Sequence, residues 1–430
     1  MNNSICNKNR TIDNSHWSNS FSDKNKGIVT RVLNHRLRKL IDTNTYSYIK
    51  DINRSSGILS KRALLMYQSR LLRKMLGTPK QYLSLDCDKL VFTMNCSDGD
   101  IQHLTNHLTS NIPLYLNNIL TVKKHAIGKV NGDCKKETSY GRTKNRPIYN
   151  HAYKITIEGK NKSHLIVYIA DGERSKNQKK SIRICYNPNN LNDFEHHVIF
   201  GYLKSTLTNR RYTQLMEKAR ITRIDVGFNI IGVIFPLVIA YPRKGTIKIT
   251  DEYPRGDCIK ETLYLGSKFK SCHTIVYDKI IKELKFDVRT IRDKSLALSY
   301  LNSSLVTTRV ERRHLPYRMK KTLLLTEMNG INIRLQDITF LDPSILIGAP
   351  KEVISQLITN KTYSRTQDFH SYFSEKDLEE SLLSLDKQWL DVQSSQLLHH
   401  YQQLILKAKK PKAKEAQQYY AQRQSKHLGV

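Results

Sequence analysis

The spacing of apolar residues in the middle of the chain constrains its fold more than any other feature. Apolar and polar side chains alternate over 152–160 and 163–173, and a short polar turn joins the two runs. Because successive side chains of a strand point to opposite faces of a sheet, this period of two predicts a β-hairpin. Further strand-like runs lie at 180–187, 221–230, 245–250, 261–266, 273–281 and 305–312.

Helical patterns flank these runs. Residues 192–219 begin at an Asn/Asp cap and read as helix, and apolar residues recur at helical spacing among basic ones at 33–41 and 64–76. After Leu382 the sequence is typical of a long polar helix. Hairpin-forming strands with flanking helices predict an α+β fold, with a mainly antiparallel central sheet and helical extensions at both ends, and not a doubly wound parallel sheet.

Composition divides the chain into five segments. We expect a mobile arm (1–28), a basic helical region that could bind DNA (29–149), a catalytic domain that holds the strands (150–345), a C-terminal helical region (346–406) and a disordered basic tail (407–430). The alternative for the second segment is a pair of ordinary helices with solvated basic faces.

The charge of the chain indicates a polyanionic partner. Lysine and arginine number 71 against 38 aspartate and glutamate, which gives a formal net charge of +33 spread along the sequence. Such an excess favours nucleic acid or an anionic membrane surface. The longest apolar run, at 230–241, is too short to span a bilayer, and the mean hydropathy is −0.52, so no membrane insertion is expected.

The cysteines and the N-terminus indicate where the chain works. Seven cysteines are scattered without a C-x-x-C pair, which suggests neither a disulfide framework nor a zinc ribbon. The first residues lack the apolar stretch of a signal peptide. We therefore expect a reducing, cytoplasmic location.

Two acidic residues stand inside apolar strands. Asp225 follows Arg223 by two positions, and Glu311 follows Arg309 by the same spacing. Residues i and i+2 of a strand share a face, so each arginine projects beside its carboxylate. A carboxylate in apolar surroundings must be paired or bound to a metal, and a few such oxygens suit Mg²⁺ or Mn²⁺. The alternative is two structural ion pairs.

Four short motifs occur in order within residues 223–311: RID (223–225), YLGSK (264–268), YDK (277–279) and RVE (309–311). In content and order they resemble the motifs of the replication initiation factor (Rep_trans) family, the plasmid and filamentous-phage initiators of rolling-circle replication. The resemblance covers roughly 150–340, under half of the chain. It departs at Asn229, where the family often has a second acidic residue. No His-hydrophobic-His triplet occurs, which disfavours the other large class of nicking enzymes.

The resemblance implies a metal-dependent single-strand endonuclease and strand transferase. Such a protein binds a double-stranded origin, nicks one strand by tyrosine attack, keeps a 5′-phosphotyrosyl bond, and leaves a 3′-OH that primes synthesis. It rejoins the strand at termination. The resemblance also implies a bacterial cytoplasm, a plasmid, phage or integrated element as template, a host helicase and polymerase as partners, and a homodimer.

The family positions map onto named residues. Tyr277 is the implied nucleophile; its alternatives are a packed aromatic at this position and Tyr264 as the attacking residue. Lys279 shares the strand face of Tyr277 and would lower the phenol pKa or bind phosphate, while Arg223 and Arg309 would orient the carboxylates. The metal ligands would be Asp225, Glu311 and Asp278, although Asp278 and Tyr277 point to opposite faces unless a bulge or strand end intervenes.

Basic residues near these motifs are candidates for DNA contact. Tyr264, Gly266, Ser267 and Lys268 would lie near the DNA backbone, and the candidate phosphate contacts are Arg210, Arg211, Lys218, Arg220, Arg312 and Arg313. Their alternative is a set of solvated basic positions. The pairs His196-His197 and His399-His400 have the wrong spacing for a nicking motif and are interpreted as helix-surface residues.

Two other functions remain open at this point. The first is a non-catalytic DNA-binding regulator of replication or transcription, in which the carboxylates are structural. The second is an RNA-binding protein, which only the charge supports.

Overall fold

A computed structural model describes most of the chain beyond residue 60. The described residues are 61–110, 112–125, 149–160, 162–170, 181–233, 238, 240–242, 262–265, 271–279, 307–318, 322–335, 338–349, 373–409 and 412–428. The expected arm at 1–28, the helix at 33–41 and the strand at 245–250 lie outside these residues.

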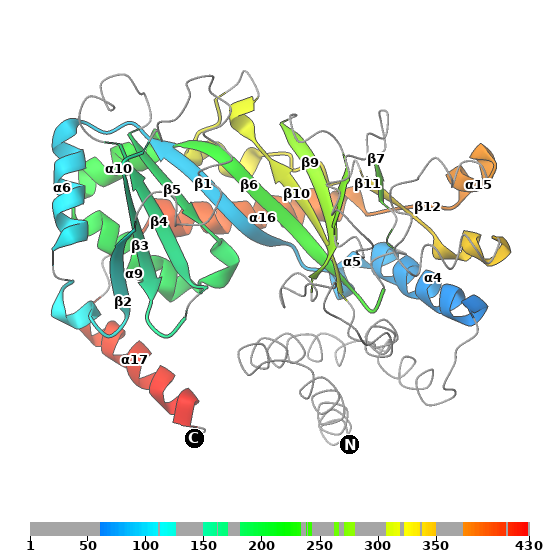
Figure 1. Ribbon diagram of the computed structural model, residues 1–430, viewed down its shortest axis with the longest axis horizontal. Coiled ribbons are helices and arrows are strands. Elements are labelled where there is room, and N and C mark those ends of the chain that lie inside the picture. Colours follow the sequence, from blue (N-terminus) through cyan, green and yellow to red (C-terminus); the bar gives the residue numbers. More distant parts are fainter. Residues whose placement is uncertain are drawn as a thin grey trace. The chain divides into compact units, whose positions relative to one another are not determined.

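Nine strands form the main sheet (Figure 1). Their pairings β2–β3, β3–β4, β4–β5, β1–β5 and β8–β9 are antiparallel, which confirms the α+β fold with a mainly antiparallel sheet. In sheet order the strands are β2 (Leu120–His125), β3 (His151–Ile157), β4 (His164–Ile169), β5 (Ile182–Tyr186), β1 (Asp86–Met94), β6 (Arg220–Ile231), β10 (Thr307–His314), β9 (Cys272–Asp278) and β8 (Thr262–Leu265).

A smaller sheet and the helices complete the described structure. Strands β12 (Leu382–Ser384), β11 (Ile338–Leu341) and β7 (Ala240–Pro242) pair in that order. The α-helices are α4 (Lys61–Gly77), α5 (Pro79–Tyr82), α6 (Asp98–Thr109), α9 (Asp193–Ser205), α10 (Asn209–Glu217), α15 (Glu375–Glu380), α16 (Lys387–Leu406) and α17 (Ala413–Leu428). Short 3-10 helices are η1 (Leu114–Leu116), η2 (Pro188–Asn190), η5 (Pro316–Arg318), η6 (Leu325–Gly330) and η8 (Pro343–Gly348). None of the described helices combines the length and apolarity needed to cross a bilayer.

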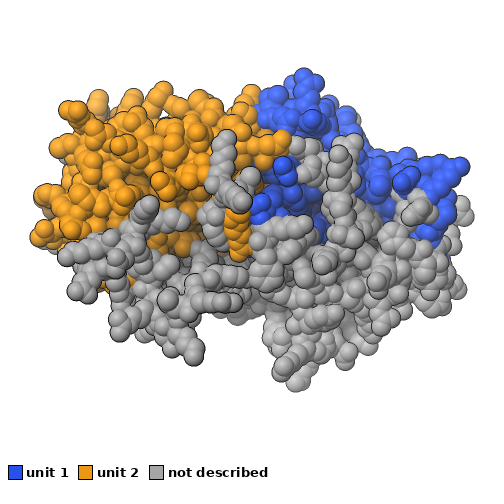
Figure 2. Space-filling view, turned by 90° about the horizontal axis from the view of Figure 1, so that it is seen from above, with its two compact units in different colours: residues 1–85, 227–313, 333–392 blue, residues 86–226, 314–332, 393–430 orange. Residues whose placement is uncertain are grey.

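The chain divides into two compact units, coloured separately in Figure 2. Unit 1 comprises 1–85, 227–313 and 333–392, and unit 2 comprises 86–226, 314–332 and 393–430. The division falls inside β6, between Val226 and Gly227, and inside β10, between Arg313 and His314. Each unit is therefore assembled from separate segments, unlike the continuous stretches expected from composition.

The predicted hairpin forms the centre of the unit 2 sheet. Residues 165–169 of β4 are buried on both faces of the sheet, and the register pair of Ile155 on β3 with Leu165 on β4 lies on one of these buried faces. Helix α9 packs on that face, where the His196 ring lies 5.7 Å from the Tyr186 ring. The expected helix at 192–219 is two helices, because Thr208 caps a new one by accepting a hydrogen bond from the Arg211 amide at 3.2 Å.

Two strands correct the expectation that 29–149 is a helical region. β1 lies in the sheet between β5 and β6, and β2 lies at its edge. The Leu90, Val91 and Phe92 side chains of β1 are fully buried on both faces. A strand buried on both faces shows a continuous apolar run and no alternation, so its sequence does not give the period-two signal.

The C-terminal segment also differs from expectation. Residues 413–428, expected to be disordered, form helix α17. The ring of Tyr419 stacks on Phe194 with centroids 4.5 Å apart, its hydroxyl donates to Glu195, and Ala416 is buried. These contacting residues lie after the basic run. The basic composition therefore did not indicate that this segment forms a helix that packs against α9.

The interpretation of the histidine pairs needs one correction. His196 is fully buried, not on the helix surface, and burial lowers its pKa to about 4. Its Nδ1 lies 2.9 Å from the carbonyl oxygen of Asn192. His399 and His400 are exposed, as expected.

Helix α4 confirms the amphipathic pattern at 64–76 in unit 1. Leu65 and Leu72 are fully buried, whereas Arg73 on the other face forms an ion pair with Asp342. The Gln68 side chain donates a 2.8 Å hydrogen bond to the carbonyl oxygen of Gly232. The four described cysteines are free thiols: Cys87, Cys96, Cys185 and Cys272.

Candidate active site

Two of the motif residues meet in unit 1. The Tyr277 hydroxyl on β9 donates a 3.2 Å hydrogen bond to Oε2 of Glu311 on β10, the neighbouring strand (Figure 1). Both side chains are buried, with 6% of Tyr277 and 4% of Glu311 exposed. A buried phenol and a buried carboxylate from motifs 34 residues apart therefore share one hydrogen bond.

Alternation along β10 separates the two arginines that follow Glu311. Arg313 lies on the same strand face as Glu311, and its Nη2 is 3.4 Å from Oε1 of that carboxylate. Arg312 points to the opposite face, where its Nη1 donates to Oγ1 of Thr274 at 2.7 Å. Arg313 thus supplies positive charge beside Tyr277 and Glu311, and Arg312 lies away from them.

The unit 1 half of β6 approaches β10 closely. Gly227 has no space for a side chain, because a Cβ there would lie 2.3 Å from the carbonyl oxygen of Val310 and 2.9 Å from Cα of Glu311. Two residues further, Oδ1 of Asn229 accepts a 3.3 Å hydrogen bond from Nη1 of the fully buried Arg309. Asn229, where the family often has an acid, therefore contacts Arg309 as a neutral acceptor.

Asp225 belongs to unit 2 and pairs with Arg223, an arginine of the same strand. The guanidinium of Arg223 contacts this carboxylate through two nitrogens: Nε lies 2.9 Å from Oδ1, and Nη2 lies 2.5 Å from Oδ2. Asp225 is 2% exposed. This geometry is the bidentate pair that the i and i+2 spacing predicts.

Several predicted residues cannot be placed against this site. Gly266, Ser267 and Lys268 lie outside the described residues. Tyr264 on β8 pairs in register with Ile275, and Asp278 is the last residue of β9, but the structure does not describe their side chains. Lys279 follows β9 and is half-buried. The roles of all six stay predictions.

Arg211, a predicted phosphate contact, is held by a carboxylate. Its Nε lies 3.0 Å from Oδ1 of Asp100, and Nη2 lies 2.5 Å from Oδ2. Hydrogen bonding to Arg211 is the largest cause that lowers the pKa of Asp100, to about 2, and Ser97 adds to it. This pair links α10 to the start of α6. Arg210, Lys218 and Arg220 are exposed.

We expect replacement of Arg211 by alanine to destabilise unit 2 in a pH-dependent way. The folded Asp100 pKa lies below its unfolded value, so the stabilisation is complete above about pH 4 and is lost as the pH falls through about 2. Arg211 is partly exposed, so the loss at pH 7 should be about 1 kcal/mol. Urea unfolding of wild type and Arg211→Ala at pH 7 and pH 2 measures it. A constant difference at both pH values would contradict the pair's role.

Sequence reasoning missed two contacts around the site. The spacing rule that pairs Arg309 with Glu311 also pairs Glu311 with Arg313, and that signal was available. The Arg309–Asn229 contact had no such signal, because it depends on which strand neighbours β10. Among the described side chains, no group of three or more His, Cys, Asp or Glu is placed to hold a metal ion.

Comparisons with known proteins add little to this picture. No family model matches the chain, and no curated protein matches it. Among solved structures, the chain is similar to a rolling-circle replication initiator protein from Geobacillus stearothermophilus, over 76% of this chain and 99% of that one. The identity is 14% and the TM-score is 0.27, so the likeness supports neither a shared fold nor a shared function.

Proposed function

We propose that the protein initiates rolling-circle replication by nicking one strand of an origin. The observation that carries the proposal is the buried hydrogen bond from Tyr277 to Glu311. It joins the YDK and RVE motifs, the two whose family positions supply the nucleophile and a metal ligand. Two motifs that the sequence singled out for related chemistry lie on neighbouring strands, and their side chains are in contact.

In this proposal Tyr277 attacks the scissile phosphate. Its oxygen forms a bond to phosphorus, and the bond from phosphorus to the 3′ oxygen breaks. Glu311, which already accepts the phenol hydrogen, takes the proton, and the leaving oxygen is protonated to a 3′-OH. The 5′-phosphotyrosyl bond keeps the energy of the broken linkage, so attack by a 3′-OH can rejoin the strand.

The carboxylates supply the oxygen-only donor set that Mg²⁺ or Mn²⁺ prefers. Oε2 of Glu311 accepts from Tyr277 and its Oε1 lies 3.4 Å from Arg313, while both oxygens of Asp225 contact Arg223, so a cation would share these carboxylates with their present partners. By the motif resemblance, Asp225, Glu311 and Asp278 would be the ligands. The metal, when bound, draws charge from a non-bridging phosphate oxygen.

The remaining residues would position the substrate. Arg223 and Arg309 orient acidic side chains and amides from within the strands. Lys279 would bind the phosphate or lower the phenol pKa. Origin DNA would be held by Tyr264, Gly266, Ser267, Lys268, Arg210, Arg211, Lys218, Arg220, Arg312 and Arg313. A host helicase and polymerase, a homodimer and a bacterial cytoplasm complete the proposal.

Nicking of supercoiled plasmid that carries a candidate origin tests the proposal. We expect open-circular product with Mg²⁺ or Mn²⁺, none with chelator, and a DNA–protein adduct that survives denaturation and disappears on proteolysis. Product without an adduct would contradict a tyrosine nucleophile. Tight origin binding with no product under any metal would contradict nicking altogether.

One observation favours a second candidate, a DNA-binding regulator without catalysis. The bidentate Arg223–Asp225 pair has the geometry of a structural ion pair. In that case an Asp225→Asn variant should lose stability and leave origin binding unchanged, and the wild type should not nick.

A further inference from the structure

Two lysines face each other across neighbouring strands of unit 2. Lys123 on β2 pairs directly with Lys154 on β3 in the antiparallel register. The Cβ atoms of such a pair are about 5 Å apart, and like charges in this position destabilise a sheet. A negatively charged group bound beside both ammonium groups would relieve this repulsion.

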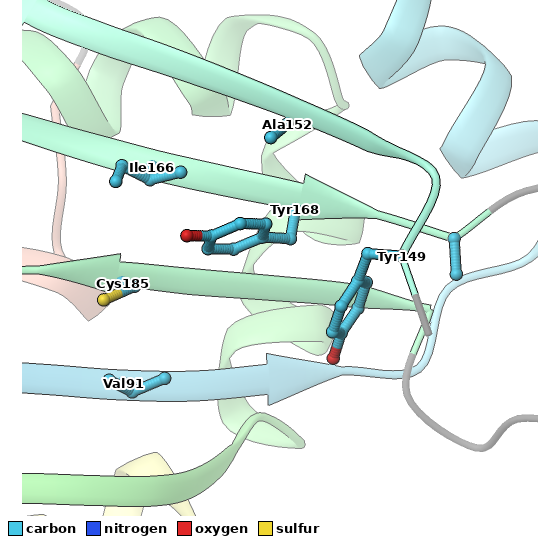
Figure 3. Close-up of a cluster of buried hydrophobic side chains, with 7 residues drawn as sticks. Val91, Tyr149, Ala152, Ile166, Tyr168 and Cys185 are labelled. Carbon is cyan, nitrogen blue, oxygen red and sulfur yellow. The ribbon is translucent and has the colours of Figure 1, made fainter. Parts of the chain in front are cut away.

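None of the described residues supplies negative charge to the pair through an ion pair. Neither Lys123 nor Lys154 has an ion-pair partner among the described residues. On the same face, the residue of β4 that pairs with Lys154 is Ile166. Ile166 is buried with Tyr168 in the cluster of Figure 3. Lys154 is half-buried in this neighbourhood, so its charge is screened less than in open water, whereas Lys123 is exposed.

Polar groups that can bind an anion surround the pair on this face. Thr121 and Thr156 form the adjacent register pair and are half-buried. On the other side lies the half-buried His125, whose Nε2 has no hydrogen-bond partner among the described residues; this nitrogen is shielded from solvent, so the ring would turn outward to contact a phosphate. Lysine ammonium groups, threonine hydroxyls and an imidazole can all contact phosphate oxygens.

Protection of a sheet edge does not account for the pair. Edge strands often have lysines that prevent pairing with another chain, and Lys123 on β2 fits that explanation. Lys154 does not, because β3 lies between β2 and β4. A half-buried lysine on an interior strand, opposite another lysine, requires a different reason.

We propose that Lys123 and Lys154, with Thr121, Thr156 and His125, form a binding site for the phosphate backbone of DNA. The net charge of +33 fits a polyanion. The choice of DNA rests on the proposed function, whereas binding of a polyanion does not. This site belongs to unit 2, whereas the Tyr277–Glu311 pair belongs to unit 1, and it would hold a strand without reading its sequence.

Fluorescence anisotropy with labelled 30-nucleotide single-stranded and duplex DNA tests the site on the full chain, without metal so that no cleavage occurs. For the Lys123→Gln, Lys154→Gln double variant we expect about tenfold weaker binding near 0.1 M salt. The slope of log K against log salt should fall by about 1.4 on single strands, since two phosphate contacts are lost. The matched control, Lys376→Gln with Lys387→Gln, removes two exposed unit 1 lysines and should stay within twofold of wild type.

A charge reversal separates binding from folding. Lys154→Glu places opposite charges across β2 and β3, so its melting temperature should equal or exceed that of wild type while DNA binding weakens. Unchanged affinity in both variants, or an equal loss in the control, overturns the proposal. Weaker binding to anionic vesicles of phosphatidylserine with full DNA affinity also overturns it. A wild type that binds DNA through these lysines but never nicks would refute the proposed function alone.

Discussion

Replacing Tyr277 by phenylalanine is expected to abolish the covalent DNA–protein adduct and to lower nicking at least about a thousandfold. The substitution removes one oxygen, which is the attacking atom, and leaves a ring of the same shape in a site where the side chain is 6% exposed. Adduct formation and nicking are measured on the same supercoiled plasmid, with the folded state checked by thermal melting.

A matched control separates chemistry from stability. Tyr212 is also buried, and its hydroxyl donates a 3.0 Å hydrogen bond to the carbonyl oxygen of Ile405. Tyr212→Phe should cost about 1 kcal/mol of unfolding free energy and leave nicking intact. Adduct formation by Tyr277→Phe would show that another tyrosine attacks, and Tyr264→Phe would then be the variant that loses it.

Replacing Glu311 by glutamine should reduce nicking by roughly a hundredfold to ten-thousandfold. The amide keeps the shape of the side chain and an acceptor oxygen for the Tyr277 hydroxyl, but it has no charge for a proton or a metal. It also leaves Arg313 without its anionic partner. Single-turnover nicking across a series of Mn²⁺ concentrations and pH values gives the size and the cause of the loss.

The two proposed roles of Glu311 leave different signatures. Loss of a metal ligand should raise the Mn²⁺ concentration for half-maximal nicking, and Asp225→Asn should raise it as well. Loss of a proton acceptor should leave that concentration unchanged and move the pH dependence of the rate. Full nicking by the Asp225→Asn, Glu311→Gln double variant in the presence of chelator would eliminate the metal from the proposal.

Local signals predicted much of the fold, because they belong to single elements. The alternation over 152–169 and the cap at Asn192 each reflect one strand or one helix, and the structure has both. β1 gave no such signal, since its burial on both faces depends on its position in the sheet. Helix α17 depends on Tyr419 reaching Glu195, a contact with a distant part of the chain.

The candidate site shows the same limit. The Arg223–Asp225 pair follows from spacing within one strand, and the structure contains it. The Tyr277–Glu311 and Arg309–Asn229 contacts each join two strands, so they depend on strand order and register. Ordered motifs suggested that these strands meet, but which atoms touch was beyond what spacing alone can specify.

The tight passage at Gly227 limits how this strand can be changed. Positions 225, 227 and 229 share one face of β6, and the middle one admits no Cβ. Next to Gly227 on this face, a new donor or acceptor can therefore stand at 225 or 229 but not between them. A redesigned cation site could use a carboxylate at position 229. A ligand could not be placed at position 227 instead, because no side chain fits there. Gly227 therefore separates positions 225 and 229 by one residue of this face that cannot carry a side chain.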